Sequence, residues 1–381
     1  MRHRVAVVTG SRAEFGLLAP VMRAVQAHEG LELITVVSGS HLLGARPTVE
    51  EVRGRFRVDA VVQMQVEGEA RTRAADARAV GRGVSGFAEA FERLRPDWVV
   101  VLGDRIEAFA AASAASIGGW AVAHIHGGDR AEGIADEAMR HAITKMAHLH
   151  LAATEGSATR IVRMGERAED VVVVGSPAVD GLGAMAPMGD EEAAGLGDPR
   201  CVILLHPSGL GDAGEREAAL ACAEEVGRVF GERGVLWLSP NHDAGREALA
   251  AVMREEVRRR GWAAAEHLER GRFVGLLKRL ARNGGVLVGN SSAGLIEAAV
   301  VGVGVVNVGP RQAGRERADN VVDVERVSAG EVEEAVRRAM GLSGRAFAHP
   351  YGDGRAGERI AAELAGRNPH DGGLLRKRNA F

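Results

Sequence analysis

Carboxylates and imidazoles follow two neighbouring apolar runs in the first half of the chain. Asp104 comes soon after residues 98–102, and His124 and His126 stand at the end of residues 121–126. Short runs of β-branched residues are typical of buried strands in a parallel sheet. Such strands deliver the residues that follow them to one edge of the sheet, where α/β proteins place their chemistry. Several titratable groups at one edge predict an acid–base enzyme rather than a passive binding module.

The pair His124 and His126 also has the spacing of two metal ligands. Alternate residues of a strand point to opposite faces, so a shared metal would require the strand to twist or end between them. Asp129, Asp136 and Glu137 follow closely and enlarge the acidic cluster. We therefore favour proton transfer over metal ligation, and keep a metal-dependent hydrolase as an alternative.

Two glycine turns between a strand and a helix could bind an anion. The first contains Arg12, and the second carries Ser291 and Ser292 directly after residues 286–289. The first turn of a helix presents backbone N–H groups and a positive dipole end to phosphate. Glu297 lies near the second turn of the later helix, where a carboxylate could accept ribose hydroxyls. The second motif predicts a diphosphate site, although an ordinary capped helix would look similar.

Two further side chains follow strands of the second half. His206 ends a run that begins at Cys201, and Arg311 lies just after another apolar run. His206 could act as a general acid or hydrogen-bond a phosphate. Arg311 could pair with or stack on a ligand. Most residues of these types are structural or face solvent, so neither assignment stands by itself.

The order of apolar runs predicts an α/β protein with two Rossmann-like domains, whose parallel sheets face a central cleft. We expect residues 1–180 to form one domain and residues 200–350 the other, with a C-terminal helix and tail over residues 351–381. Residues 367–381 are polar and contain glycine, which indicates a loose end. The pattern Gly81-Arg-Gly-Val-Ser-Gly86 follows a helical stretch instead of a strand, so it does not predict a dinucleotide site. We expect strands over residues 4–9, 33–38, 60–64, 98–102, 121–125, 149–153, 171–174, 201–205, 235–239, 286–289, 303–308 and 321–324.

Composition limits the possible partners. A formal net charge of -3 gives no reason to expect nucleic acid or a charged membrane. The two cysteines, Cys201 and Cys222, form neither a C-x-x-C motif nor a disulfide framework, which fits a reducing compartment. No stretch approaches the roughly 18 apolar residues of a spanning helix. A cytoplasmic location is expected.

With these residues in place, the chain resembles the hydrolysing UDP-N-acetylglucosamine 2-epimerase family, whose relatives include the non-hydrolysing epimerases and the GT-B glycosyltransferases. The resemblance covers about residues 4–365 and rests on motifs in family order. These are Thr9-Gly-Ser-Arg-Ala-Glu14, Ser38-Gly-Ser-His41, Leu102-Gly-Asp-Arg105, His124-Ile-His-Gly-Gly-Asp129, Arg140-His-Ala-Ile-Thr-Lys145, His206-Pro207, Gly289-Asn-Ser-Ser292 and Arg311-Gln-Ala-Gly-Arg-Glu316.

The resemblance implies a reaction without metal or nicotinamide cofactor. The UDP-sugar loses its C2 proton and UDP by anti elimination, and water then adds to the glycal with inversion at C2. It implies that the first domain supplies acid and base groups and that the second binds UDP. It also implies a homodimer or homotetramer.

Roles follow from the resemblance residue by residue. Asp104 matches the carboxylate that assists proton transfer near C2, Asp136 matches a second acid/base carboxylate, and His206 matches the histidine beside the diphosphate. The remaining matches are nucleotide contacts: Arg12, Ser291, Ser292 and Arg311 at the diphosphate, Glu297 at the ribose, and Asn241 and Phe273 near the uridine.

One departure from the family pattern concerns the sugar. Well-studied members have a proton-transfer glutamate where this chain has His126. Either His126 shuttles the proton, Asp129 replaces the glutamate, or the pocket serves another sugar, such as UDP-2,4-diacetamido-2,4,6-trideoxyglucose of the legionaminic acid pathway. A GT-B glycosyltransferase that uses a UDP-sugar is the alternative from another enzyme class.

Overall fold

The structure is a computed structural model, and it describes residues 2–44, 47–69, 72–131, 136–241, 245–325 and 330–380, with the side chain of Asp136 also outside the description. The chain divides into two compact units. The first unit contains Met1–Asp129, Ala135–Asp180 and Tyr351–Phe381, and the second contains Arg130–Ile134 and Gly181–Pro350. Each unit is described by itself below.

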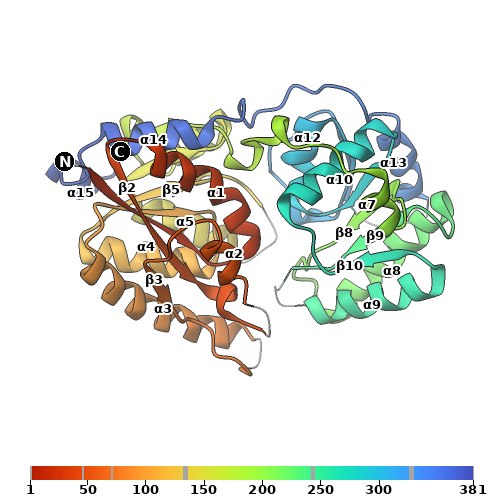
Figure 1. Cartoon of the computed structure of the whole chain (residues 1–381), viewed down its shortest axis with the longest axis horizontal. Helices are drawn as coiled ribbons and strands as arrows, with labels where there is room; N and C mark the ends of the chain where they lie inside the picture. Colours follow the sequence, from red (N-terminus) through yellow and green to blue (C-terminus); the bar gives the residue numbers. More distant parts are fainter. Residues whose placement is uncertain are drawn as a thin grey trace. The chain divides into compact units, whose positions relative to one another are not determined.

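The first unit is built on a parallel sheet of seven strands in the order β3-β2-β1-β4-β5-β6-β7 (Figure 1). Its strands are β1 (His3–Thr9), β2 (Leu31–Ser38), β3 (Ala60–Val62), β4 (Trp98–Leu102), β5 (Ala121–Ile125), β6 (Leu149–Ala152) and β7 (Val171–Val173). Its helices are α1 (Arg12–Ala27), α2 (Val49–Arg53), α3 (Arg73–Leu94), α4 (Ile106–Gly118), α5 (Asp136–Met146), α6 (Glu155–Arg163), α14 (Ala356–Gly366) and α15 (Gly372–Leu375), with 3-10 turns η1 (Gly39–Leu42), η2 (Ala168–Asp170) and η3 (Pro177–Val179).

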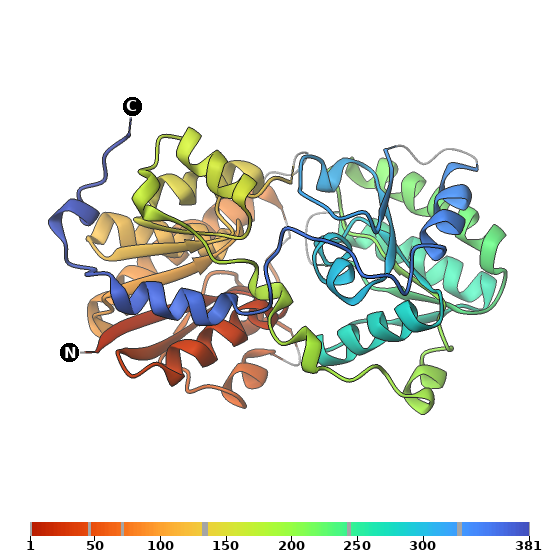
Figure 2. The same cartoon turned by 90° about the horizontal axis from the view of Figure 1, so that it is seen from above.

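Side chains of the central strands alternate between two apolar layers. Val5 and Val7 of β1 face the layer that contains α1 and α14, whereas Ala6 and Val8 face the layer that contains α3, α4 and α5. Because both faces of the sheet are covered, the central strand β4 is apolar along its whole length rather than alternating with polar residues. The helix-covered sheet is visible from two directions in Figures 1 and 2.

The second unit repeats this plan with six parallel strands in the order β10-β9-β8-β11-β12-β13. Its strands are β8 (Cys201–Leu204), β9 (Val235–Leu238), β10 (Ala263–Ala265), β11 (Val286–Gly289), β12 (Gly304–Val308) and β13 (Val321–Val324). Its helices are α7 (Asp190–Gly195), α8 (Gly211–Phe230), α9 (Arg246–Arg260), α10 (Arg270–Arg282), α11 (Ser292–Leu295), α12 (Glu297–Val301) and α13 (Glu331–Met340), with 3-10 turns η4 (Leu182–Ala184) and η5 (Pro310–Gln312). The predicted α/β class with two parallel sheets is confirmed.

In each sheet, the strands that follow the first strand of the unit are added on one side of it, and the later strands are added on its other side. The position between the two groups is the topological switch point. In the first unit this switch point lies between β1 and β4, and in the second it lies between β8 and β11. Open α/β sheets bind their ligands outside the carboxyl ends of the strands at such a point. The two switch points are therefore where the predicted site residues should lie.

The glycines of the pattern Gly81–Gly86 lie within α3, as the sequence indicates. A Cβ added at Gly83 would lie 2.8 Å from Met64, and one at Gly86 would lie 2.8 Å from Val62 of β3. These glycines let the helix approach the sheet closely, so their role is packing and not nucleotide binding.

The C-terminal residues complete the first unit. Helix α14 contributes Ile360 and Leu364 to the apolar layer of α1. The expectation that residues 367–381 are loose is wrong for the described part of this segment, because Lys377 forms an ion pair with the buried Glu166. Burial alone would raise the pKa of Glu166, but hydrogen bonds from His150, Lys145 and Lys377 lower it to about 2.

Candidate active site

The β1–β4 switch point of the first unit carries Asp104. Strand β4 ends at Leu102, and Gly103 adopts a left-handed turn with φ of 73° that brings Asp104 to the sheet edge. Arg140 of α5 forms an ion pair with the carboxylate of Asp104. The Arg140 side chain is only 2% exposed, whereas that of Asp104 is 21% exposed. A cation in contact with a carboxylate favours its ionised form, which is the form that accepts a proton.

His124 holds the backbone next to Asp104. Its Nε2 donates to the carbonyl of Gly103 at 2.7 Å, and its Nδ1 lies 3.3 Å from the hydroxyl of Thr144 on α5. Burial lowers the pKa of His124 to about 3, although the hydrogen bond to Gly103 opposes this effect. His124 is therefore a neutral structural group that ties the Asp104 turn to α5.

His126 lies one residue beyond β5 and faces partners other than those of His124. Its Nδ1 lies 2.9 Å from the Asp129 carboxylate and its Nε2 lies 2.9 Å from the Ser176 hydroxyl. The two histidines thus have separate hydrogen-bond partners. Among the described residues, no group of three or more His, Cys, Asp or Glu side chains is arranged to hold a metal.

The first glycine turn of the unit begins α1. The hydroxyl of Ser11 caps the helix by accepting from the backbone N–H of Glu14, and the Glu14 carboxyl accepts from the backbone N–H of Gly10 at 2.6 Å. Arg12 is one-third exposed and forms an ion pair of 2.7 Å with Glu51 of α2. The turn has the helix N-terminus and the cation that its sequence predicts. The ion pair between Arg12 and Glu51 was not indicated by the sequence.

A buried acidic pair lies below this turn. Glu107, at the start of α4, is 1% exposed, and a Cβ at Gly10 or at Gly39 would come within 2.6 Å of its side chain. Burial, together with the nearby charge of Glu107, raises the pKa of Glu14 to about 8. Glu14 is therefore largely protonated at neutral pH, and the glycines at both strand ends are needed to make room for Glu107.

The β8–β11 switch point of the second unit carries His206 and Asn290. The Asn290 side chain accepts from the backbone N–H of His206 at 2.7 Å and donates to the carbonyl of His206 at 2.8 Å. The Nδ1 atom of His206 accepts from the backbone N–H of Asn241 at 3.1 Å. This bond leaves Nε2 as the nitrogen that carries the proton of a neutral His206 ring.

Arg311 and the serines surround the same backbone. The Arg311 guanidinium donates to the carbonyls of Pro207 and Asn290, both at 3.2 Å. Ser291 caps α11, and its hydroxyl accepts from the backbone N–H of Ala293. A Cβ at Gly289 would lie 2.0 Å from the Leu204 carbonyl oxygen, so glycine permits the close approach of β8 and β11. These contacts lie at the carboxyl edge of the second sheet, near the ends of β8 and β11. The residues gathered there are His206, Asn241, Ser291, Ser292 and Arg311.

Glu297 and Phe273 lie on two helices of the second unit. Glu297 begins α12, is 8% exposed, and has an ion pair of 3.7 Å with Arg270 of α10. Phe273 stands one turn after Arg270 on the same helix and packs against the apolar layer of that face. Arg270 and Arg140 are candidate ligand contacts that the sequence did not indicate, whereas Asn290 belongs to the predicted diphosphate motif.

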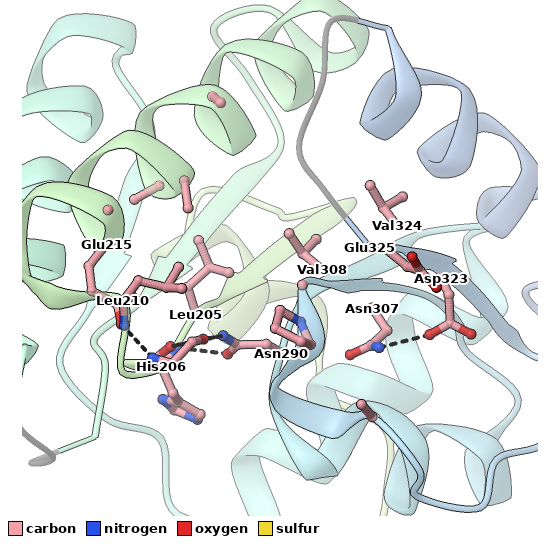
Figure 3. A pocket seen from close by; sticks show the side chains of 18 of the residues that line it. Leu205, His206, Leu210, Glu215, Asn290, Asn307, Val308, Asp323, Val324 and Glu325 are labelled. Atoms are coloured by element: carbon pink, nitrogen blue, oxygen red, sulfur yellow. Dashed lines mark hydrogen bonds between the residues drawn. The ribbon is translucent and has the colours of Figure 1, made fainter. Parts of the chain in front are cut away.

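A cavity of about 940 Å³ opens beside His206 in the second unit (Figure 3). His206 and Asn290 line it, but within the described part of the chain Ser291, Ser292 and Arg311 are not among its lining residues. Glu215, Glu217, Asp323 and Glu325 also line it, together with Arg317, which forms an ion pair with Asp323. The cavity therefore adjoins the predicted diphosphate residues through His206 and Asn290, and its remaining charged lining is mostly acidic.

Asp136 is the one predicted site residue whose side chain lies outside the described residues. Its backbone begins α5, the helix that also carries Arg140. No described helix is long and apolar enough to cross a membrane.

Comparisons with known proteins concern the chain as a whole. Residues 23–365 match the family model for UDP-N-acetylglucosamine 2-epimerase. The chain is 33% identical to a UDP-N,N'-diacetylbacillosamine 2-epimerase (hydrolyzing) from Legionella pneumophila, over 100% of both chains. It is 28% identical to a UDP-N-acetylglucosamine 2-epimerase from Neisseria meningitidis, over 89% of this chain and 88% of that one.

The fold has solved counterparts. The structure of UDP-GlcNAc 2-epimerase from Methanocaldococcus jannaschii, in complex with UDP-GlcNAc and UDP, is similar with a TM-score of 0.80 at 18% identity. The likeness covers 96% of this chain and 100% of that one. Together with the family match and the full-length relative, these findings show that the chain belongs to the UDP-N-acetylglucosamine 2-epimerase family, as an enzyme of its hydrolysing branch.

Proposed function

We propose that this enzyme is a hydrolysing UDP-N-acetylglucosamine 2-epimerase that releases UDP and N-acetylmannosamine. The observation that carries the proposal is the ion pair between Asp104 and the buried guanidinium of Arg140 at the first switch point. It supplies an ionised carboxylate in a fixed position, which is what removal of a C2 proton requires.

The reaction proceeds in two balanced steps. In the first, Asp104 takes the proton from C2 while the C1–O bond breaks, and the bonding electrons leave with UDP to give a 2-acetamidoglucal. In the second, water adds its oxygen to C1, and C2 receives a proton on the opposite face. Asp136 is the second acid/base group of this proposal.

The second switch point receives the leaving diphosphate. His206 carries its ring proton on Nε2, where it can be donated to a phosphate oxygen as the C1–O bond breaks. At this point Arg311 supplies cationic charge, and Ser291 and Ser292 supply hydroxyls. Glu297 accepts from the ribose, and Asn241 and Phe273 flank the uracil. Arg12, at the first glycine turn of the first unit, is a further diphosphate contact. These roles follow the family resemblance, and the bond from Asn241 to Nδ1 of His206 supports the assigned ring orientation.

A second candidate substrate is UDP-2,4-diacetamido-2,4,6-trideoxyglucose, which is UDP-N,N'-diacetylbacillosamine. The full-length relative from L. pneumophila is named for this sugar. His126, which stands where well-studied family members have glutamate, also favours it, because it alters the sugar end of the proposed site. The two candidates share the elimination chemistry and differ only at C4 and C6 of the sugar.

The experiment offers both UDP-sugars to the enzyme without any acceptor. We expect stoichiometric UDP and free 2-epimerised sugar, and the higher kcat/KM identifies the substrate. A GT-B glycosyltransferase would release UDP only when an acceptor is added. Failure of both sugars to yield UDP and an epimer would refute the proposal.

The proposal also includes the cellular setting. We place the enzyme in the cytoplasm, in nonulosonic acid biosynthesis, as a homodimer or homotetramer. Cys201 and Cys222 are both free and buried, which supports a reducing compartment. The pathway and the oligomer rest on the family resemblance.

A further inference from the structure

His126 has an unusual backbone conformation and a fully engaged ring. Its φ of 63° lies in the left-handed region, which few residues other than glycine adopt without support. Its backbone N–H donates to Leu151 of β6 at 3.2 Å, and its side chain is 8% exposed. Each ring nitrogen has a protein partner at 2.9 Å, Asp129 on one side and Ser176 on the other.

The partners define the protonation of the ring. An ionised carboxylate only accepts, so Nδ1 donates its proton to Asp129. The hydroxyl of Ser176 accepts from the backbone N–H of Ala178 at 3.2 Å and donates its own proton to Nε2. A neutral imidazole is thereby satisfied at both nitrogens.

The order Asp129–His126–Ser176 is that of a serine hydrolase triad, but its environment is different. Ser176 is 0% exposed, so its hydroxyl cannot attack a substrate from solvent. The arrangement therefore joins the end of β5 to the segment after β7 and acts as a brace.

Asp129 connects this brace to the proposed catalytic carboxylate. Its backbone carbonyl accepts from Arg140 at 3.0 Å, and the other arm of the same guanidinium contacts Asp104. The second carboxylate oxygen of Asp129 accepts from Ser157 of α6 at 2.8 Å. His126 and Ser157 together fix Asp129, which in turn fixes Arg140.

Contacts of Gly128 with α6 further restrain the turn between His126 and Asp129. Gly128 has φ of 72°, and a Cβ there would lie 2.3 Å from the carbonyl oxygen of Ser157. Arg160 donates to the carbonyl of Gly128 at 2.5 Å. The turn therefore has little freedom to rearrange while His126 keeps its bond to Asp129.

We propose that His126 is a positioning residue, which holds Arg140 against Asp104 through Asp129, and that its ring does not exchange protons with the substrate. The inference rests on the proposed function, in which Asp104 takes the C2 proton. It explains how the enzyme can be active with histidine in place of the family glutamate. In this proposal the histidine holds Asp129 in position and takes no part in proton transfer.

Two substitutions separate positioning from proton transfer. In His126→Asn, the amide nitrogen takes the place of Nδ1 and can still donate to Asp129, and asparagine tolerates the left-handed backbone. In His126→Gln, the amide instead reaches the place of Nε2, and the Asp129 carboxylate oxygen that faces His126 loses that donor, while the bond from Ser157 to the other oxygen remains. Neither amide can transfer a proton.

The inference predicts different kcat values for these variants. We expect His126→Asn to keep kcat within about tenfold of the wild type, and His126→Gln to lose about 100-fold, the typical effect of a misplaced catalytic group. KM should change less than threefold in both variants. His370→Gln is a matched control, because the Nε2 atom of His370 lies 2.8 Å from the Asp97 carboxylate and the side chain is 69% exposed, so its kcat should not change.

A third variant covers the case in which a substitution at His126 prevents folding. Ser157→Ala removes a bond to Asp129 and leaves His126 intact, so the brace predicts a several-fold lower kcat with an unchanged KM. Equal inactivity of folded His126→Asn and His126→Gln would overturn the inference. Unchanged turnover in Ser157→Ala would overturn it as well.

Hydrogen exchange tests the brace without turnover and so separates it from the proposed function. Backbone amides of residues 103–106 and 137–140 should exchange faster in His126→Gln than in wild type, and at the wild-type rate in His126→Asn. Equal exchange in both variants would contradict the brace even if the enzyme is active. A wild type that neither releases UDP nor epimerises its substrate would refute the proposed function instead.

Discussion

The two switch points hold their functional side chains by different means. At the first, charged groups contact each other: Asp104 pairs with Arg140, and Arg140 also pairs with Glu137 at 2.9 Å. At the second, His206 is held by the neutral amide of Asn290 and by a backbone N–H. A fixed charge suits a group that must remain an ionised base, whereas neutral donors suit a group that binds an anion.

The pKa values show the same difference. Burial lowers the pKa of His41 and His148 to about 4 and that of His124 to about 3, and all three lie in the first unit. In the described part of the second unit, His349 is the histidine whose pKa burial lowers. Acidification therefore acts on more buried histidines in the first unit than in the second.

The largest expected loss of kcat follows from a substitution at the first switch point. Asp104→Asn should lower kcat about 1000-fold, because general base catalysis contributes roughly 100- to 10,000-fold. The dissociation constant of UDP, measured by calorimetry, should stay within twofold. Asp212→Asn, on the exposed first turn of α8, is the control and should have wild-type kcat. Normal turnover of Asp104→Asn would remove its assigned role.

A smaller effect is expected at the second switch point. Combined Ser291→Ala and Ser292→Ala should raise KM about tenfold and leave kcat within threefold, because these hydroxyls bind substrate and transition state alike. Steady-state kinetics of UDP release measure both constants. The contrast between the switch points fails if this variant lowers kcat as strongly as Asp104→Asn does.

Acid should loosen the first unit before the second. Burial lowers the pKa of His41, His124, His148 and His150, so these groups take up protons below about pH 6.5 more readily in the unfolded chain, and stability falls as pH drops from 6.5 toward 4. Glu14, with its pKa of about 8, acts in the opposite direction between pH 8 and 4.5, but it is one group against four. Hydrogen exchange, corrected for its intrinsic pH dependence, should show greater loss of protection in the first unit at pH 5. Equal loss in both units would contradict this prediction.

The smallest effect concerns the C-terminal segment. Lys377→Met removes one of the two lysines that pair with Glu166, while Lys145 and the hydrogen bond to the His150 ring remain. Because the Lys377 side chain is about one-quarter exposed, we expect a loss of only about 1 kcal/mol in the free energy of unfolding. Urea denaturation measures this loss, and kcat should stay within twofold. A stability equal to that of the wild type would show that the ion pair contributes nothing.

Long apolar runs made the main strands predictable. Residues 98–102 contain three consecutive valines, and residues 121–125 are apolar apart from His124; they form β4 and β5 with the expected bounds. Strand β10 was missed because Ala263–Ala265 has no β-branched residue and is a strand only through its pairing with β9. Local composition carries no signal for such a strand.

The site was predictable where residues follow strands, and not where distant residues meet. Asp104, His206 and Ser291 each lie directly beyond a strand, so topology brings them to a switch point. Arg140 lies on a helix, and its contact with Asp104 depends on how α5 packs against the sheet. Ser176 meets His126 across 50 residues of sequence, and no local pattern indicates that bond.

The most direct test of the account is NMR of the product formed in heavy water from the preferred UDP-sugar. The account predicts one deuterium at C2 of the released, 2-epimerised sugar in the wild type, and no labelled product from Asp104→Asn. A released sugar that retains its original hydrogen at C2 would contradict proton removal by Asp104 and, with it, the proposed elimination.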